Sequence, residues 1–201
     1  MLLLNVVFDL GGVVLNWQPR EVVQRVFEDP KIQQLVSAQI IGHDDWVELD
    51  RGTLTADQAI GRGAERTGLL RADISRLFHE VPRSLTPIHE TLELIRRVRD
   101  NGNRLFVLSN MHSATIAYLE EKHDFWDMFD GIVVSCRIRK VKPELEIYEY
   151  LLREYQLEAT DTVFIDDLNE NLEAASVAGI QTIRFVSPSQ CRQDLMDLKC
   201  I

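Results

Sequence analysis

Four positions along the chain carry the groups that transfer of a phosphoryl group would need. Asp9 offers a carboxylate, which can act as a nucleophile and form a covalent acyl phosphate. Attack of an anion on a phosphate dianion requires positive charge, which Lys142 and a cation held by Asp166 and Asp167 would supply. The hydroxyl of Ser109 can bind a phosphate oxygen. These residues predict a Mg²⁺-dependent hydrolase in which Asp9 attacks the phosphorus of a phosphate ester.

The turn that follows Asp9 offers main-chain groups for the same anion. Backbone N–H groups of Leu10–Gly12 can hold phosphate oxygens, and the two glycines let the backbone approach closely. Asn110, directly after Ser109, is a further polar candidate. A single Asp at the end of a strand often only caps the next helix. Four polar positions that converge on one crevice are much harder to explain by capping alone.

These residues follow short apolar runs that predict the strands of a parallel sheet. The runs are nearly continuous and rich in β-branched or aromatic residues, which is typical of strands covered on both faces. Ligands of doubly wound sheets bind beyond the carboxyl ends of the strands, so these polar residues would meet at one edge. The predicted strands are Leu2–Phe8, Arg104–Leu108, Gly131–Ser135, Thr162–Ile165 and Thr182–Val186.

Helical patterns separate the later strands. The alternation predicts an α/β fold, a doubly wound, Rossmann-like parallel sheet of about five strands. The predicted helices are Thr86–Asp100, Ser113–Glu121, Glu144–Glu154, Asn171–Ala178 and Gln190–Leu198.

The stretch between the first two strands breaks this rhythm. It holds no convincing strand, and its apolar spacing is helical. We therefore predict a small all-helical cap of residues 16–82, inserted into an α/β core of residues 1–15 and 83–201, above the carboxyl end of the first strand. Its predicted helices are Arg20–Phe27, Lys31–Ile41 and Thr55–Arg66.

Composition limits the possible partners. The chain has 22 Lys and Arg against 32 Asp and Glu, a formal net charge of −10, and no dense basic cluster. Nucleic acid and anionic membrane surfaces are therefore not expected partners. No stretch approaches the ~20 apolar residues of a transmembrane helix, and the three scattered cysteines lack metal-ligand spacing. We expect a soluble cytoplasmic protein, monomeric or homodimeric, with a small phosphate ester as its partner.

Four segments in order, FDLGGVV, VLSN, RKVKPE and FIDDLNEN, resemble motifs I to IV of the haloacid dehalogenase superfamily. Each motif alone is weak, but the ordered set spans essentially the whole chain. The helical cap after the first motif is similar to that of the C1-capped subfamily. The closest resemblance is to small sugar-phosphate phosphatases of the α-D-glucose-1-phosphate phosphatase type, which share the DLG step and an Arg-Gly step in the cap.

The resemblance implies a role for each matching residue. Asp9 would be the nucleophile, and Lys142 would bridge the nucleophile and the phosphate. Asn171 would support the acidic loop, in which Asp167 would be the main metal ligand. The implied phosphate-binding residues are Leu10, Gly11, Ser109, Asn110 and Lys142. The implied Mg²⁺ ligands are Asp9, the carbonyl of Gly11, Asp166 and Asp167.

The sequence departs from the family pattern at Gly11. Most phosphatases of the superfamily have a second Asp there, which protonates the leaving oxygen and then activates water. Three explanations are compatible with glycine at this position. The leaving group needs little acid help, or a cap residue or water transfers the proton, or the protein is weakly catalytic and binds phosphate esters. The runner-up enzyme is a 2-haloacid dehalogenase, whose Asp attacks carbon without a metal. The acidic pair Asp166-Asp167 argues against it.

Substrate choice is expected to lie in the cap. Trp46 could stack on a sugar and Arg51 could bind its hydroxyls, which favours a sugar phosphate as substrate. The alternative is that the segment GHDDWVELDRG is a solvated surface loop, with Trp46 in the cap's own core. His112 follows Ser109 closely and could reach the site, although a residue at the start of a helix is the simpler interpretation.

Overall fold

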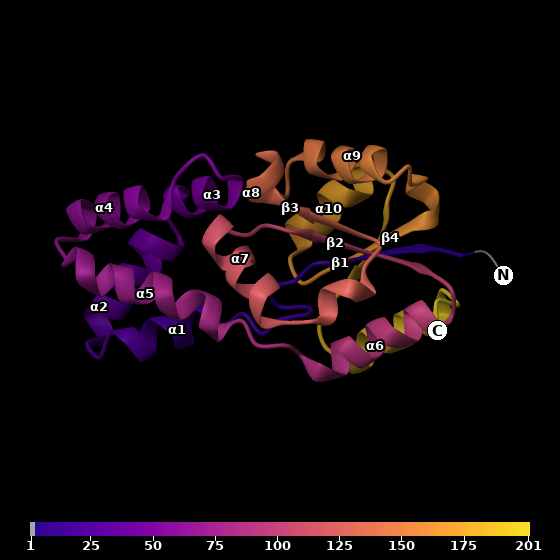
Figure 1. The fold of residues 1–201 in the computed structure, drawn as a ribbon, viewed down its shortest axis with the longest axis horizontal. Helices are drawn as coiled ribbons and strands as arrows, with labels where there is room; N and C mark the ends of the chain where they lie inside the picture. Colours follow the sequence, from indigo (N-terminus) through magenta and orange to yellow (C-terminus); the bar gives the residue numbers. More distant parts are fainter. Residues whose placement is uncertain (1–2) are drawn as a thin grey trace.

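Five parallel strands form a single sheet, as the sequence predicts. The computed structural model describes residues 3–201, so Leu2, part of the predicted first strand, lies outside the described residues. The strand order is β3-β2-β1-β4-β5, and every neighbouring pair is parallel (Figure 1). The first strand therefore lies at the centre of the sheet. The strands are β1 (Asn5–Phe8), β2 (Arg104–Ser109), β3 (Gly131–Val134), β4 (Thr162–Asp166) and β5 (Gln181–Arg184).

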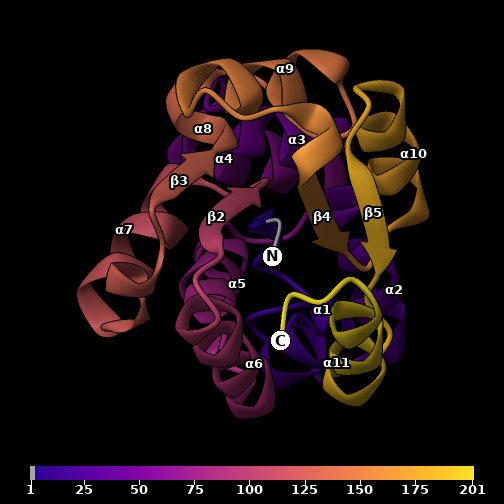
Figure 2. The ribbon, with the colours of Figure 1, turned by 90° about the vertical axis from the view of Figure 1, so that its right-hand side faces the viewer.

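Helices cover both faces of this sheet. Successive side chains of a strand point to opposite faces. Val6 and Phe8 accordingly pack with one group of helices and Val7 with the other. Figure 2 shows the two groups on opposite sides of the strands. The first group contains α6 (His89–Asp100), α7 (Ser113–Lys122) and α11 (Pro188–Asp197), and the second contains α9 (Leu145–Glu154) and α10 (Asn169–Val177).

The chain between β1 and α6 is helical and packs around a core of its own. In Figure 1 these helices gather at one end of the molecule, and α3 lies beside the short helix α8 (Ser135–Ile138) of the core. Their shared core contains Val22, Ile40, Ile60, Ile74 and Leu77. The helices are α1 (Pro19–Val26), α2 (Pro30–Val36) with its π-helical continuation η1 (Ser37–Ile41), α3 (Asp44–Arg51), α4 (Ala56–Thr67) and α5 (Arg71–Ser84).

The interpretation of GHDDWVELDRG as a surface loop is wrong, because this segment forms helix α3. The ring nitrogen Nδ1 of His43 accepts a hydrogen bond from the Asp45 N–H at 3.1 Å and so caps the first turn. Two acidic residues favour that positive helix end. Gly52, with φ of 75°, ends the helix in the left-handed conformation. The sequence does not predict α5 as a separate helix either, since Pro82 lies inside it.

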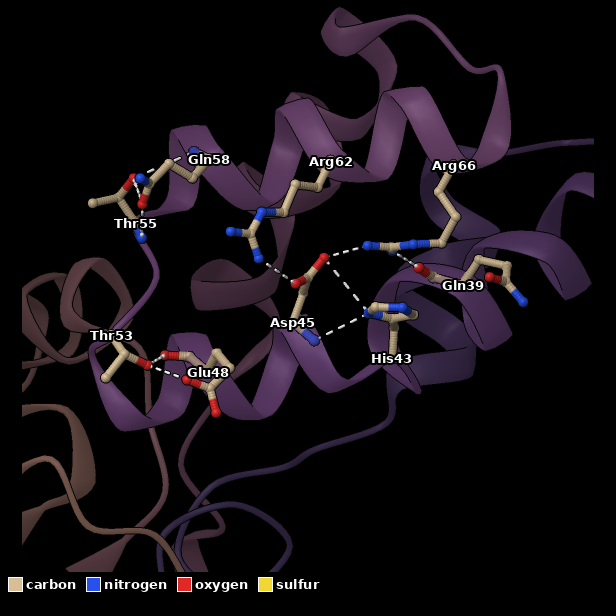
Figure 3. A network of polar contacts seen from close by, with 9 residues as sticks. All are labelled: Gln39, His43, Asp45, Glu48, Thr53, Thr55, Gln58, Arg62 and Arg66. Carbon is tan, nitrogen blue, oxygen red and sulfur yellow. Dashed lines mark hydrogen bonds and ion pairs between the residues drawn. The ribbon is translucent and has the colours of Figure 1, made fainter.

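Helix α3 is fixed to α4 by a polar network around Asp45 (Figure 3). The Asp45 carboxylate accepts a hydrogen bond from Arg62 at 3.0 Å and another from Arg66. Arg66 also donates to the backbone carbonyl of Gln39, and thereby connects η1 to the same network. Although burial opposes it, these arginines lower the pKa of Asp45. The polar residues of this segment therefore hold η1, α3 and α4 together.

No helix within residues 3–201 is both long enough and apolar enough to cross a membrane.

Candidate active site

A cavity of about 450 Å³ lies where the carboxyl ends of the strands meet the helices between β1 and α6. One part of its wall is polar and comes from the strand ends. Another part is apolar and comes from α1, α3 and α5 and from residues that lie just outside helices. The polar residues are Asp9, Ser109, Asn110, Lys142, Asp167 and Asn171, with Asp50 and His112 beside them. The apolar residues are Trp17, Pro19, Trp46, Val81, Leu85, Met111 and Leu168.

A lysine between two carboxylates forms the centre of the polar part. The ammonium nitrogen of Lys142 lies 2.8 Å from Asp9 Oδ1 and 2.6 Å from Asp166 Oδ2. All three side chains are almost completely buried. Charge-assisted hydrogen bonds of this length fix the orientation of the Asp9 carboxylate. The lysine therefore sits where it could bridge a nucleophilic carboxylate and an anion.

Burial raises the pKa of Asp9 to about 7. The charge of Lys142 opposes this rise, while Asp166 adds to it. The two carboxylates also raise the pKa of Lys142, against the opposing effect of burial, so the lysine remains positively charged. A second positive charge near Asp9 would favour its ionised form, which is the form that attacks.

Three carboxylates at this site fit a hard divalent cation. One oxygen from each of Asp9, Asp166 and Asp167 can be chosen so that all three lie within 4.8 Å of one another. Oxygen donors with net negative charge are the ligands that Mg²⁺ prefers. Burial, followed by repulsion from Asp166, raises the pKa of Asp167, as expected where carboxylates crowd together without a cation. The donor set therefore fits Mg²⁺.

The two acidic residues of the fourth strand end differ in their surroundings. Asp166 accepts hydrogen bonds from the Leu168 N–H at 2.8 Å and from Asn171 Nδ2 at 3.0 and 3.1 Å, as well as from Lys142. In the described part of the chain, no other residue donates to the carboxylate of Asp167. Asn171 thus orients Asp166, and Asp167 is left freer to bind a cation.

The loop after Asp9 must pass close to the acidic pair, and this explains one of its glycines. Gly12 has φ of 80°, and a Cβ there would lie 2.6 Å from Asp167 Oδ2. Gly11 is different, since a Cβ would make only ordinary contacts of 3.7–3.9 Å with Trp17. Within residues 3–201, the N–H groups of Leu10 and Gly11 donate to no carbonyl. They remain available to an anion in the cavity.

The second strand end supplies one buried hydroxyl and one positioning group. Ser109 ends β2 and is 1% exposed, and it lines the cavity beside Asp9. The side-chain amide of Asn110 donates to the carbonyl of Lys142 at 2.9 Å and accepts from its N–H at 2.8 Å. Asn110 therefore holds the lysine loop in place. Its predicted contact with phosphate remains a prediction.

Aromatic side chains form much of the apolar part. Trp46 projects from α3 and stacks against Trp17, with ring centroids 6.3 Å apart. It also packs edge-on against the ring of His112, at a centroid distance of 4.4 Å. Trp46 therefore both lines the cavity and belongs to the packing of the cap, so the two alternatives for this residue are compatible.

Arg51 does not line the cavity, in contrast to its predicted role as a substrate-binding residue. Its guanidinium forms two hydrogen bonds with Glu144, of 2.7 and 2.8 Å. Residues four apart share one face of an α-helix, as Trp46 and Asp50 do in α3. Arg51 follows Asp50 directly and therefore points to a different side of the helix. Arg51 instead connects α3 to the start of α9, and this bidentate pair leaves its planar group occupied.

Two cavity residues were missed or underestimated at the sequence level. Asp50 lines the cavity, and its Oδ1 lies 3.3 Å from Nε2 of His112. His112 directly precedes α7, as the simpler interpretation expects, and it is also 8% exposed and lines the cavity. The signal for Asp50 was the spacing of a helix: Trp46 and Asp50 are four residues apart and share one face of α3.

The chain is similar to known proteins over most of its length. The model of the family described as haloacid dehalogenase-like hydrolase matches residues 6–185. The sesquiterpene phosphatase astK of Aspergillus oryzae is 29% identical over 174 residues, which cover 87% of this chain and 85% of that protein. The D-ribitol-5-phosphate phosphatase of Bacteroides thetaiotaomicron is 22% identical, covering 95% and 96% of the two chains.

A solved structure shares the fold. It is a wild-type family enzyme from Bacteroides thetaiotaomicron in complex with magnesium and inorganic phosphate. The TM-score is 0.71 at 21% identity, over 90% of this chain and 93% of that one.

Proposed function

The chain belongs to the haloacid dehalogenase-like hydrolase family, and from this premise we propose that it hydrolyses a phosphate monoester with an apolar organic group. The coarser conclusion, that it is a phosphoric monoester hydrolase, agrees with the named relatives. The observation that carries the finer proposal is the lining of the cavity, which combines a buried carboxylate and lysine with a largely apolar set of side chains.

The site residues would divide the chemistry between them. The carboxylate of Asp9 attacks phosphorus, and Lys142 holds both the nucleophile and a phosphoryl oxygen. Ser109 and the N–H groups of Leu10 and Gly11 hold the remaining oxygens. When bound by Asp9, Asp166 and Asp167, with the predicted help of the Gly11 carbonyl, Mg²⁺ would neutralise charge that develops on the phosphoryl group.

We further propose that the helices of the predicted cap, residues 16–82, cover the bound substrate and exclude water. Trp17 and Trp46 belong to this part of the chain, and both line the cavity together with Asp9 and Lys142. Exclusion of water strengthens the electrostatic interactions within the site.

The apolar wall favours a hydrocarbon group over the sugar predicted from the sequence. A sugar carries several hydroxyls, and each needs a hydrogen-bond partner once it is buried. Away from the strand ends, the polar side chains of the wall are Asp50, His112 and Thr115, and the first two lie against each other. Leu168 lines the cavity although it is 49% exposed, which provides apolar surface at its mouth. A buried hydrocarbon would leave fewer groups without a partner.

Phosphate release from farnesyl phosphate is expected to be at least about 10-fold more efficient than from glucose 1-phosphate, as measured by kcat/KM with Mg²⁺ present. A 10-fold preference corresponds to about 1.4 kcal/mol, which burial of roughly 60 Å² of extra apolar surface would supply. The variant Leu168→Asn should reduce the preference without unfolding the protein, because the side chain is half exposed. Faster hydrolysis of glucose 1-phosphate would instead support the sugar-phosphate prediction.

Chelation of divalent cations is expected to reduce phosphate release by at least about 10²-fold, since a bound metal ion supplies several kcal/mol of stabilisation to the transition state. Added Mg²⁺ should restore the rate. Mg²⁺ should also raise the thermal unfolding temperature of the wild-type protein, because it relieves repulsion among three carboxylates. Activity that survives the chelator would contradict the phosphatase and favour the metal-free dehalogenase reaction.

A further inference from the structure

The site as described lacks a group that could give a proton to the leaving oxygen. Gly11 lies two residues after Asp9, the position at which the family resemblance implies an acid/base residue. Lys142 already forms ion pairs with both Asp9 and Asp166. An alkoxide is a poor leaving group, so hydrolysis of an alkyl phosphate requires a proton donor close to that oxygen.

One further carboxyl group lines the cavity, and it comes from the cap. Asp50 is at the end of α3, with its side chain 14% exposed. It lines the same cavity as Asp9 and lies close enough for the charges of Asp9 and Lys142 to affect its titration. Its partner is His112, which is packed against Trp46 and whose Nε2 lies 3.3 Å from Asp50 Oδ1.

The backbone around Asp50 is attached to the core. The carbonyl of Asp50 accepts a hydrogen bond from the hydroxyl of Ser135. The next residue, Arg51, forms the bidentate pair with Glu144. Gly52 lies against the backbone of Cys136, where a Cβ would come within 2.5 Å of the carbonyl oxygen. A carboxyl group held in this way is positioned before substrate binds, as proton transfer requires.

The surroundings of Asp50 favour its protonated form. Burial raises the pKa of Asp50 to about 8, against the opposing charge of Lys142 and with a further increase from Asp9. Burial lowers the pKa of His112 to about 4, so at neutral pH the imidazole is uncharged. A neutral imidazole does not stabilise a carboxylate by charge, and its unprotonated nitrogen can accept the Asp50 hydroxyl. The carboxyl group therefore retains the proton that an acid must provide.

We propose that Asp50, oriented by His112, is the general acid and base of this enzyme and takes the role left vacant by glycine at position 11. The inference rests on the proposed phosphatase function. It makes Asp50 a catalytic residue of the cap and His112 a positioning residue of the core, so the two parts of the chain would complete the site together.

The proposed reaction has two steps, and Asp50 transfers a proton in each of them. As Asp9 forms its bond to phosphorus, the bond between phosphorus and the alkyl oxygen breaks, and that oxygen takes the proton of Asp50 to leave as an alcohol. The Asp50 carboxylate then accepts a proton from water as the water oxygen attacks the aspartyl phosphate. The bond between phosphorus and Asp9 breaks and inorganic phosphate leaves, so Asp9 and Asp50 return to their starting forms.

The test compares two leaving groups in Asp50→Asn. Asparagine can still bond to His112, so this change removes the acid and preserves the contact between the cap and the core. Turnover of farnesyl phosphate should fall about 10²- to 10⁴-fold. With p-nitrophenyl phosphate, whose leaving group departs without a proton, the variant should release a rapid burst of nitrophenol, about one per active site. Slow turnover should follow, because attack by water on the aspartyl phosphate has lost its base.

Asp44→Asn and the wild-type protein are the controls, which distinguish failure of the Asp50 inference from failure of the proposed phosphatase function. Asp44→Asn makes the same change at an exposed position of α3 and should leave both activities near wild type. Farnesyl phosphate turnover in Asp50→Asn within about threefold of wild type would overturn the inference. A nitrophenol burst that is slowed as much as farnesyl phosphate turnover would overturn it too. A wild-type protein that releases no phosphate from either ester with Mg²⁺ would overturn the proposed function itself.

A second variant tests the role by restoring the missing group elsewhere. Position 11 accepts a Cβ with ordinary contacts to Trp17, so the double variant Gly11→Asp/Asp50→Asn has room for the family's usual acid. We expect it to recover at least about 10-fold of the lost farnesyl phosphate turnover. A double variant as slow as Asp50→Asn would count against proton transfer as the role of Asp50.

Discussion

Asp9→Asn is expected to reduce phosphate release by on the order of 10⁴- to 10⁶-fold, the loss typical of removing a covalent nucleophile. The amide has nearly the shape of the carboxylate, and its oxygen can still accept the hydrogen bond of 2.8 Å from Lys142. The variant therefore loses the attacking group and keeps the packing around it. The measurement is single-turnover and steady-state phosphate release from farnesyl phosphate with Mg²⁺.

The same substitution should not weaken the fold. Asp9 is buried beside Asp166 and Asp167, so its charge is repelled by two others in the metal-free protein. In chelator, Asp9→Asn is expected to unfold at the same urea concentration as wild type or at a higher one. Asp100→Asn, at the exposed end of α6, is the matched control for activity. Activity above about one hundredth of wild type would exclude Asp9 as the covalent nucleophile.

Lys142→Met should lower both activity and stability. The Lys142 side chain is 2% exposed, and its ammonium group lies within 2.8 Å of two buried carboxylates, so removal of this group leaves their charges unpaired. Breaking a buried pair in this way costs about 3–5 kcal/mol of unfolding free energy. Loss of the group that stabilises the transition state should reduce kcat by about 10²- to 10³-fold or more. Urea unfolding in chelator and steady-state kinetics with Mg²⁺ measure the two effects.

A double-mutant cycle measures how much of the stability lost in Lys142→Met comes from its ion pair with Asp9. In an Asp9→Asn background, one of the two unpaired carboxylates is gone, so Lys142→Met should cost less stability than it does in wild type. Lys140→Met changes a partly exposed lysine of the same loop and should leave the unfolding midpoint close to wild type. Strictly additive free energies would show that Lys142 and Asp9 are not coupled.

The sequence predicts most of the core because parallel strands have a local signature. Runs of β-branched and aromatic residues identify all five strands, and within the described residues the bounds differ by no more than two residues from the predicted ones. At β1 this difference is Leu3 and Leu4, which precede the strand. Strand ends also carry the chemistry in doubly wound sheets, so the positions of Asp9, Ser109 and Asp166 followed from the same pattern.

The helices of the predicted cap were predicted less well than the strands, because their polar residues bond to one another between helices. Asp45 and Arg66 resemble solvated surface residues in the sequence, but they bond across η1, α3 and α4 (Figure 3). Because α3 is highly polar, the sequence shows no clear apolar spacing that would predict a helix there. The shared face of Trp46 and Asp50 was therefore not predicted either. The predicted contact of Arg51 with substrate failed for a related reason, since only the fold brings Glu144 to its guanidinium.

The sequence by itself predicted that Asp9, Lys142 and the acidic pair Asp166-Asp167 would lie together, because they follow strands of one parallel sheet. It also has glycine at position 11, where the family resemblance implies an acidic residue. Tertiary structure decided everything that depends on how the helices between β1 and α6 meet the rest of the chain: the apolar wall of the cavity, the pairing of Arg51 with Glu144, and the contact of Asp50 with His112. Asp50 and His112 are 62 positions apart in the chain, and no periodic pattern relates two residues whose contact depends on how separate packing units meet.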